Sequence, residues 1–197
     1  RTVDVFILTG QSNSLGTSAD KSEKDITPGE SRADKNIRFF WSNRSTRAGD
    51  GTAALIGDSG GKIVPLQEQQ GEGRNPVFWG PEVGFGRGLY DAGMRDFLII
   101  KASRGGGGNG YWLKGAQDDH MYRHIVSTVK AGLKALPVGT RIRIRAMLYV
   151  QGESDRGDEA ALAGARLATL AENLRKDLPS AKEMQVVVGG IAAAGAR

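Results

Sequence analysis

Short runs of apolar and β-branched residues recur along the chain, and longer segments with a different periodicity separate them. Runs of this length without polar interruption are typical of strands that are buried on both faces of a sheet. The pattern predicts strands at residues 3–8, 37–41, 97–102, 143–150 and 184–191.

The segments between these runs have apolar residues at helical spacing. They predict helices at 81–93, 118–136 and 158–178, and a proline follows each of the last two, as expected of a helix stop signal. Strands that alternate with helices imply right-handed crossovers around a parallel sheet. We therefore expect an α/β fold, a three-layer, doubly wound (flavodoxin-like) domain with a parallel sheet of about five strands. The stretch 42–79 has no clear period and predicts a long loop or insertion.

Composition and charge narrow the classes of protein that fit. A chain of 197 residues with 39% hydrophobic content can bury one core, so we expect a single domain over residues 1–197. The net charge of +5 comes without a block of lysine or arginine, which disfavours nucleic acid as a partner. The absence of cysteine excludes disulfides and thiolate metal sites. No apolar run approaches the length of a membrane span.

Three polar, glycine-rich segments directly follow predicted strands: GQSNSLG at 10–16, SRGGGGNG at 103–110 and QGESD at 151–155. Ligands of parallel α/β sheets bind outside the carboxyl ends of the strands. We expect the three segments to meet at one edge of the sheet and to form the functional site.

Ser12 lies in the first turn after the first strand, so its hydroxyl is expected at the edge of the sheet. The backbone N–H groups of Ser12 and Asn13 would point into the same space, which combines a nucleophile with an oxyanion donor. The simpler interpretation is that Ser12 caps a short helix.

The other two segments offer further donors and acceptors. Four consecutive glycines allow the backbone to approach a ligand closely, and Asn109 adds a side-chain amide. A flexible loop is the alternative, since the spacing and lysine of a phosphate-binding loop are missing. Gln151 can donate to an oxyanion, and Glu153 and Asp155 can orient a partner or a loop. The alternative for this segment is a polar turn with a helix cap at Ser154 or Asp155.

In this order the motifs resemble the SGNH (GDSL-type) hydrolases, in particular the branch of sialate O-acetylesterases and acetylxylan esterases that includes carbohydrate esterase family six. The resemblance covers nearly the whole chain. It rests on GQSNSLG, QGESD, the helix start GPEVGFGRGL at 80–89 and the strand with its glycine block, IIKASRGGGG, at 99–108.

The resemblance implies an esterase that transfers an acyl group to water, usually an acetyl group from a sugar hydroxyl, without a metal or an organic cofactor. Its partner would be an acetylated carbohydrate or a small ester, with no role for nucleic acid or a membrane. The resemblance also favours a secreted or periplasmic location.

Carried over residue by residue, Ser12 would be the nucleophile and would give the first oxyanion donor. Gly106 would give the second, or a neighbouring glycine if the register shifts. Gln151 would give the third, with Asn109 as the alternative. Supporting roles fall to polar residues around these positions: Gln11, Asn13, Asn109, Glu153 and Asp155.

The base that should activate Ser12 is missing from its usual place. In the family it is a histidine close to the C-terminus, two or three residues after an aspartate, but no histidine follows His124 here. Three explanations stay open. The sequence is part of a longer enzyme and lacks its C-terminal catalytic loop and final helix; His120, two residues after Asp118, or His124 supplies the base; or the protein binds carbohydrate without cleaving it.

Two residues near the glycine block are candidates for substrate contacts. Arg104 offers a cation to a carboxylate, and Trp112 offers an aromatic face to a sugar ring. The alternative for Trp112 is that it covers the core.

Overall fold

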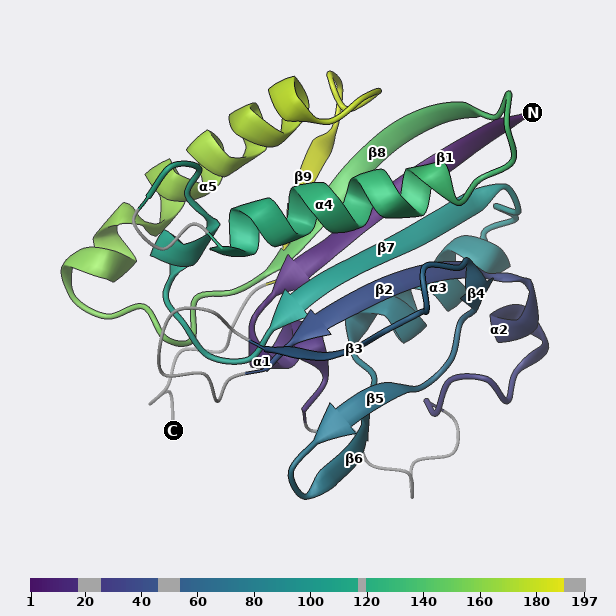
Figure 1. The fold of residues 1–197 in the computed structure, drawn as a ribbon, viewed down its shortest axis with the longest axis horizontal. Helices are drawn as coiled ribbons and strands as arrows, with labels where there is room; N and C mark the ends of the chain where they lie inside the picture. Colours follow the sequence, from purple (N-terminus) through teal and green to yellow (C-terminus); the bar gives the residue numbers. More distant parts are fainter. Residues whose placement is uncertain (18–25, 46–53, 117–119, 190–197) are drawn as a thin grey trace.

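A computed structural model describes residues 1–17, 26–45, 54–116 and 120–189 of the chain (Figure 1). The strands are β1 (Thr2–Gly10), β2 (Arg38–Arg44), β3 (Leu55–Asp58), β4 (Val64–Pro65), β5 (Gln69–Glu72), β6 (Asn75–Phe78), β7 (Phe97–Arg104), β8 (Arg141–Val150) and β9 (Gln185–Val188). The helices are α1 (Ser12–Leu15), α2 (Arg32–Asn36), α3 (Pro81–Asp91), α4 (His120–Lys134) and α5 (Asp158–Asp177), with a 3-10 turn η1 (Asn109–Trp112).

The main sheet has the strand order β3-β2-β7-β1-β8-β9. Strands β2, β7, β1, β8 and β9 run parallel, which confirms the predicted parallel sheet. Without β2, the order β7-β1-β8-β9 corresponds to the first four places of the flavodoxin-like order 2-1-3-4-5. β1 therefore lies in the interior of the sheet, between the strands that carry the other two polar segments.

The two faces of the sheet carry separate cores because successive side chains of each strand point to opposite sides. Val3, Val5 and Ile7 of β1 pack with α4 and α5, whereas Phe6 and Leu8 belong to the second core. That second core includes side chains of β2 and is completed by Phe85, Leu89 and Tyr90 of α3 and by Ala33 of α2. Figure 1 shows α4 and α5 together on the near face of the sheet.

The prediction of a long loop over 42–79 is wrong, because the described part of this stretch forms secondary structure. Its first residues continue β2, and β3 and β4 then pair antiparallel with β2. β5 and β6 form a separate antiparallel hairpin. These strands are only two to four residues long. Their pairing depends on the neighbouring strand rather than on a hydrophobic period of their own.

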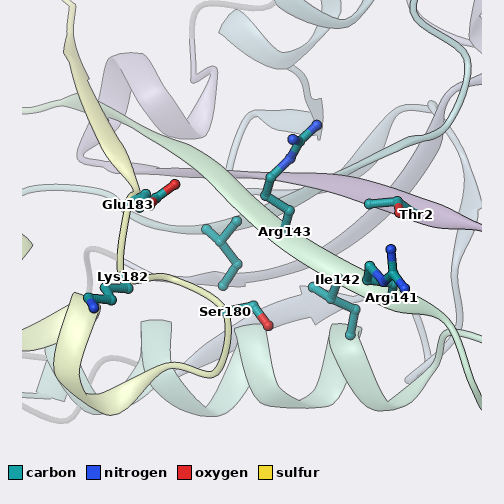
Figure 2. Close-up of a pocket in the computed structure, with 8 residues that line it drawn as sticks. Thr2, Arg141, Ile142, Arg143, Ser180, Lys182 and Glu183 are labelled. Atoms are coloured by element: carbon teal, nitrogen blue, oxygen red, sulfur yellow. The ribbon is translucent and has the colours of Figure 1, made fainter.

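A hollow of about 400 Å³ lies beside the start of β8 (Figure 2). Thr2, Arg141, Ser180 and Lys182 are among the residues that line it. Thr2 and Arg141 begin β1 and β8, so this hollow lies at the amino ends of the parallel strands, opposite the edge where the polar segments follow. No helix in the described part of the chain is long and apolar enough to cross a membrane.

Candidate active site

The register of the sheet brings the three polar segments to one edge. Gly10, the last residue of β1, lies beside Ser103 of β7 and Val150 of β8. The backbone N–H of Gln11 also donates to the carbonyl oxygen of Val150, at 3.0 Å. The segments that follow the three strands therefore start from neighbouring positions, as the sequence predicted.

The turn around Ser12 is built on two glycines that other residues cannot replace without strain. Gly10 has φ +147° and Gly16 has φ +89°, both in the region that favours glycine. A Cβ on Gly10 would lie 1.8 Å from the carbonyl oxygen of Val150, and one on Gly16 would lie 2.0 Å from that of Trp79. The motif thus allows the backbone of this turn to pack directly against two other backbone segments.

Ser12 is the half-buried first residue of α1. The N-cap position is occupied by Gln11, whose side chain makes no capping bond, so Ser12 is not the helix cap of the simpler interpretation. Within the described residues, the Ser12 hydroxyl has no hydrogen-bond partner and its backbone N–H has no acceptor. Ser12 therefore offers a free hydroxyl and a free N–H at the carboxyl end of β1.

The segment after β8 contacts both neighbours of Ser12. The Glu153 carboxylate accepts hydrogen bonds from Nε2 of Gln11 and from Nδ2 of Asn13. The Ser154 hydroxyl donates to Oε1 of Gln11, at 2.8 Å. GQSNSLG and QGESD, far apart in the sequence, thus form one hydrogen-bonded unit.

The glycine segment lies against Gln151. Gly106 and Gly107 have φ +63° and +102°, and the backbone N–H of Gly106 has no acceptor among the described residues. The buried Gln151 donates through Nε2 to the carbonyl oxygen of Gly107 at 3.4 Å and accepts from the Tyr149 hydroxyl at 3.3 Å. Burial, together with the charges of Asp155 and Glu153, raises the pKa of Tyr149, so its hydroxyl keeps its proton and donates.

Asn109 and Asp155 join the glycine segment to the start of α5. The backbone N–H of Asn109 donates to Oδ1 of Asp155 at 2.8 Å, and its side-chain amide donates to the carbonyl oxygen of Glu159 at 2.9 Å. Arg166 donates to the oxygen of the Asn109 amide. The Asn109 amide donates at 2.9 Å, whereas the Gln151 amide donates at 3.4 Å, so the Asn109 amide is held more firmly. This difference favours Gln151 over Asn109 as a donor to a ligand.

The structure contains a buried ion pair next to α1 that the sequence did not predict. Lys101 and Glu82 are both 0% exposed, and Nζ of Lys101 lies 2.9 Å from both carboxylate oxygens. The same ammonium donates to the carbonyl oxygen of Leu15, the last residue of α1, at 3.1 Å. The GPE motif singled out in the sequence contains Glu82, but nothing in the sequence indicates that Lys101, inside an apolar strand, is its partner.

The two histidines lie on α4. The Arg104 guanidinium donates to Nε2 of His120 at 2.9 Å, and the His120 ring packs against Tyr111. Asp118, the residue that suggested a pair with His120, lies outside the described residues. His124 bonds Ser42 and Arg44, and burial lowers its pKa to about 4. Neither histidine forms a hydrogen bond with Ser12 in the described structure.

The two candidate substrate contacts are both buried, but they contact different groups. Trp112 is 1% exposed and donates through Nε1 to the Thr9 hydroxyl at 3.1 Å, so it covers the core, the second of its two expected roles. Arg104 is 5% exposed, with its guanidinium over the Tyr111 ring and no carboxylate partner among the described residues. The described residues contain no cluster of three acidic or histidine side chains that could hold a metal ion.

Comparisons with solved structures agree with this fold. Among solved structures, the chain is similar to a protein from Arabidopsis thaliana, with 20% identity, a TM-score of 0.62, and coverage of 99% of this chain and 76% of that chain. It is also similar to NanS, with 19% identity, a TM-score of 0.56, and coverage of 96% and 67%. These two likenesses show the fold. A search of curated protein sequences finds no match.

A family model described as "Carbohydrate esterase, sialic acid-specific acetylesterase" matches residues 2–197. This match includes all three polar segments at the carboxyl edge of the sheet. The chain therefore belongs to the sialic acid-specific acetylesterase family of carbohydrate esterases.

Proposed function

We propose that this protein is a carbohydrate O-acetylesterase that removes acetyl groups from sugar hydroxyls through an acyl-enzyme on Ser12. The observation that supports this most directly is the state of Ser12. Its hydroxyl and N–H have no partner among the described residues, although the side chains on both sides of it are held in place. A serine arranged in this way is available to a ligand at the edge where α/β sheets bind ligands.

In the proposed reaction, Oγ of Ser12 attacks the acetyl carbonyl carbon and gives up its proton to a base. The negative charge on the carbonyl oxygen is stabilised by the N–H groups of Ser12 and Gly106 and by Nε2 of Gln151. The bond to the sugar oxygen then breaks, the sugar takes the proton, and Ser12 carries the acetyl group. Water attacks this ester in the same way and releases acetate.

Within the described residues, His120 is the candidate for the base. Its Nε2 accepts a hydrogen bond from Arg104, so the ring must leave Arg104 before this nitrogen can take the Ser12 proton. His124 is a weaker candidate because it is buried and both of its ring nitrogens are bonded to β2. A catalytic histidine elsewhere in a longer chain stays a prediction.

The proposed substrate is an acetylated sugar, and an acidic sugar is favoured over acetylated xylan. The description of the family names sialic acid, which carries a carboxylate. Arg104, the last residue of β7, is a buried cation without a carboxylate partner among the described residues. A buried charge usually has a partner, so this guanidinium is the group that we propose to attract the sugar carboxylate.

The alternative is a relative that binds acetylated carbohydrate without cleaving it. The observation that favours it is that, in the part of the chain that the structure describes, neither His120 nor His124 forms a hydrogen bond with Ser12. Without a base, a serine hydroxyl is a poor nucleophile near neutral pH.

Two assays distinguish an esterase from a protein that only binds carbohydrate. The first is hydrolysis of 4-nitrophenyl acetate, and the second is release of acetate from O-acetylated sialic acid and from acetylated xylan. We expect the wild type to be active and Ser12→Ala to lose at least about a thousandfold in kcat/KM. Ser127→Ala, an exposed serine of α4, is the matched control and should retain activity. His120→Ala tests the base. Binding of the acetylated sugar with no turnover by the wild type would favour the alternative.

A further inference from the structure

We propose that Glu153 is a positioning residue, which holds the two neighbours of Ser12 and thereby fixes the direction of the Ser12 hydroxyl. The inference rests on the proposed role of Ser12 as nucleophile. It adds that the esterase site depends on a carboxylate that does not itself touch the substrate.

The carboxylate of Glu153 binds the residues on both sides of the nucleophile, and we call this arrangement the bracket. One oxygen of Glu153 accepts from Gln11, the residue before Ser12, and the other accepts from Asn13, the residue after it. The Ser154 hydroxyl donates to the oxygen of the Gln11 amide, whose nitrogen is the group bound by Glu153. Gln11 is buried, so any rotation of its amide would leave buried polar atoms without partners.

The turn needs such a bracket because α1 cannot hold itself. The helix consists of only Ser12–Leu15, and its N-cap side chain makes no capping bond. A single helical turn is not stable without contacts to the rest of the protein. The direction of the Ser12 hydroxyl must therefore be set by neighbouring elements.

The loop that carries Glu153 is itself anchored on both sides. Before it, the carbonyl oxygen of Val150 accepts from the backbone N–H of Gln11 at 3.0 Å. After it, the backbone N–H of Asp155 donates to Gly152 at 3.1 Å, and the Asp155 carboxylate accepts from Asn109 at 2.8 Å. A carboxylate suits this position because it accepts from two donors at once and has no hydrogen to donate.

The first test is kinetic. We expect Glu153→Gln to lower kcat by about ten- to a hundredfold with little change in KM, because the substrate still binds but the hydroxyl is less well aligned. The introduced amide can accept from only one of the two donors and places its NH₂ against the other. Asp158→Asn, which removes an exposed carboxylate in the first turn of α5, is the matched control and should retain the wild-type kcat.

The second test exchanges the two groups. Gln11→Glu alone sets two carboxylates against each other and should lower kcat at least as much as Glu153→Gln. In the double variant Gln11→Glu/Glu153→Gln, the amide at position 153 can donate to the carboxylate at position 11 and still accept from Asn13. Ser154 can still donate to position 11. We expect kcat of the double variant to exceed that of either single variant by at least about tenfold.

Two outcomes would overturn the inference in an active enzyme: a wild-type kcat for Glu153→Gln, or a double variant no better than the single variants. If the wild type instead shows no ester hydrolysis, the proposed function fails. The bracket is then tested by urea unfolding of the wild type, the two single variants Glu153→Gln and Gln11→Glu, and the double variant. Destabilisation by each single change that is relieved in the double variant would support the bracket. Strictly additive changes in the free energy of unfolding would reject it.

Discussion

At the scale of single residues, the polar side chains of the site differ in how free they are to meet a ligand. Gln151 makes two long hydrogen bonds, at 3.3 and 3.4 Å, whereas the Asn109 amide is held by Glu159 and Arg166. Long hydrogen bonds are weak, so the Gln151 amide can turn towards an oxyanion at little cost. The two amides should therefore respond to mutation in different ways.

We expect Gln151→Leu to lower kcat by about a hundred- to a thousandfold, the usual effect of removing one oxyanion donor. Asn109→Ala should mainly lower the free energy of unfolding, by about 1–3 kcal/mol, because it removes the hydrogen bonds of a buried side chain to Glu159 and Arg166. Steady-state kinetics and urea unfolding of both variants check this. A larger loss of kcat in Asn109→Ala than in Gln151→Leu, at unchanged stability, would assign the donor role to Asn109.

At the scale of elements, α1 is held by hydrogen bonds at its last residue as well as at its start. Lys101 of β7 reaches the carbonyl oxygen of Leu15 at the end of α1, and Glu82 of α3 compensates its charge. The backbone N–H of Gly80 and the amide of Gln69 also donate to Glu82, at 2.9 and 2.8 Å. Burial lowers the pKa of Lys101, and the neighbouring carboxylate opposes this shift by favouring the charged ammonium.

We expect Lys101→Met to cost about 3–5 kcal/mol in the free energy of unfolding, because it leaves the Glu82 carboxylate buried without its cation. The double variant Lys101→Met/Glu82→Gln should recover most of this loss, since no buried charge remains. Urea denaturation of the single and double variants measures both quantities. A double variant less stable than Lys101→Met would show that the charge of Glu82 is compensated by another group.

At the scale of the whole molecule, the sequence predicted those parts of the fold whose pattern is set by burial. The central strands are apolar on both faces, and the predicted helices agree with α3, α4 and α5 to within a few residues. The strands of 55–78 were missed because their partners, not their own residues, make them strands. The three segments of the site were predicted from their places after strands. Their contacts, such as Glu153 with Gln11 and Asn13, depend on tertiary pairing that no local pattern encodes.

One contact between layers should make the stability of the whole molecule depend on pH. His124 of α4 lies against β2, where its Nε2 donates to the carbonyl oxygen of Ser42 at 2.9 Å and its Nδ1 accepts from Nε of Arg44 at 3.3 Å. Burial lowers the pKa of His124 from 6.5 to about 4, and the positive charge of Arg44 contributes to the shift. The folded protein therefore keeps this histidine neutral in mildly acidic solution, whereas the unfolded chain protonates it.

Between pH 6.5 and pH 4 the unfolded state binds more protons than the folded state at this position, so the free energy of unfolding falls as the pH is lowered through this interval. The shift corresponds to a loss of about 3 kcal/mol. His124→Gln, whose amide can still donate to Ser42, should lack this part of the pH dependence. Urea unfolding of both proteins at pH 7 and at pH 4.5 isolates the contribution of His124, because all other titratable groups are the same in the two proteins. Equal losses in the two proteins would mean that the folded structure accepts a proton on His124 without opening the contact between α4 and β2.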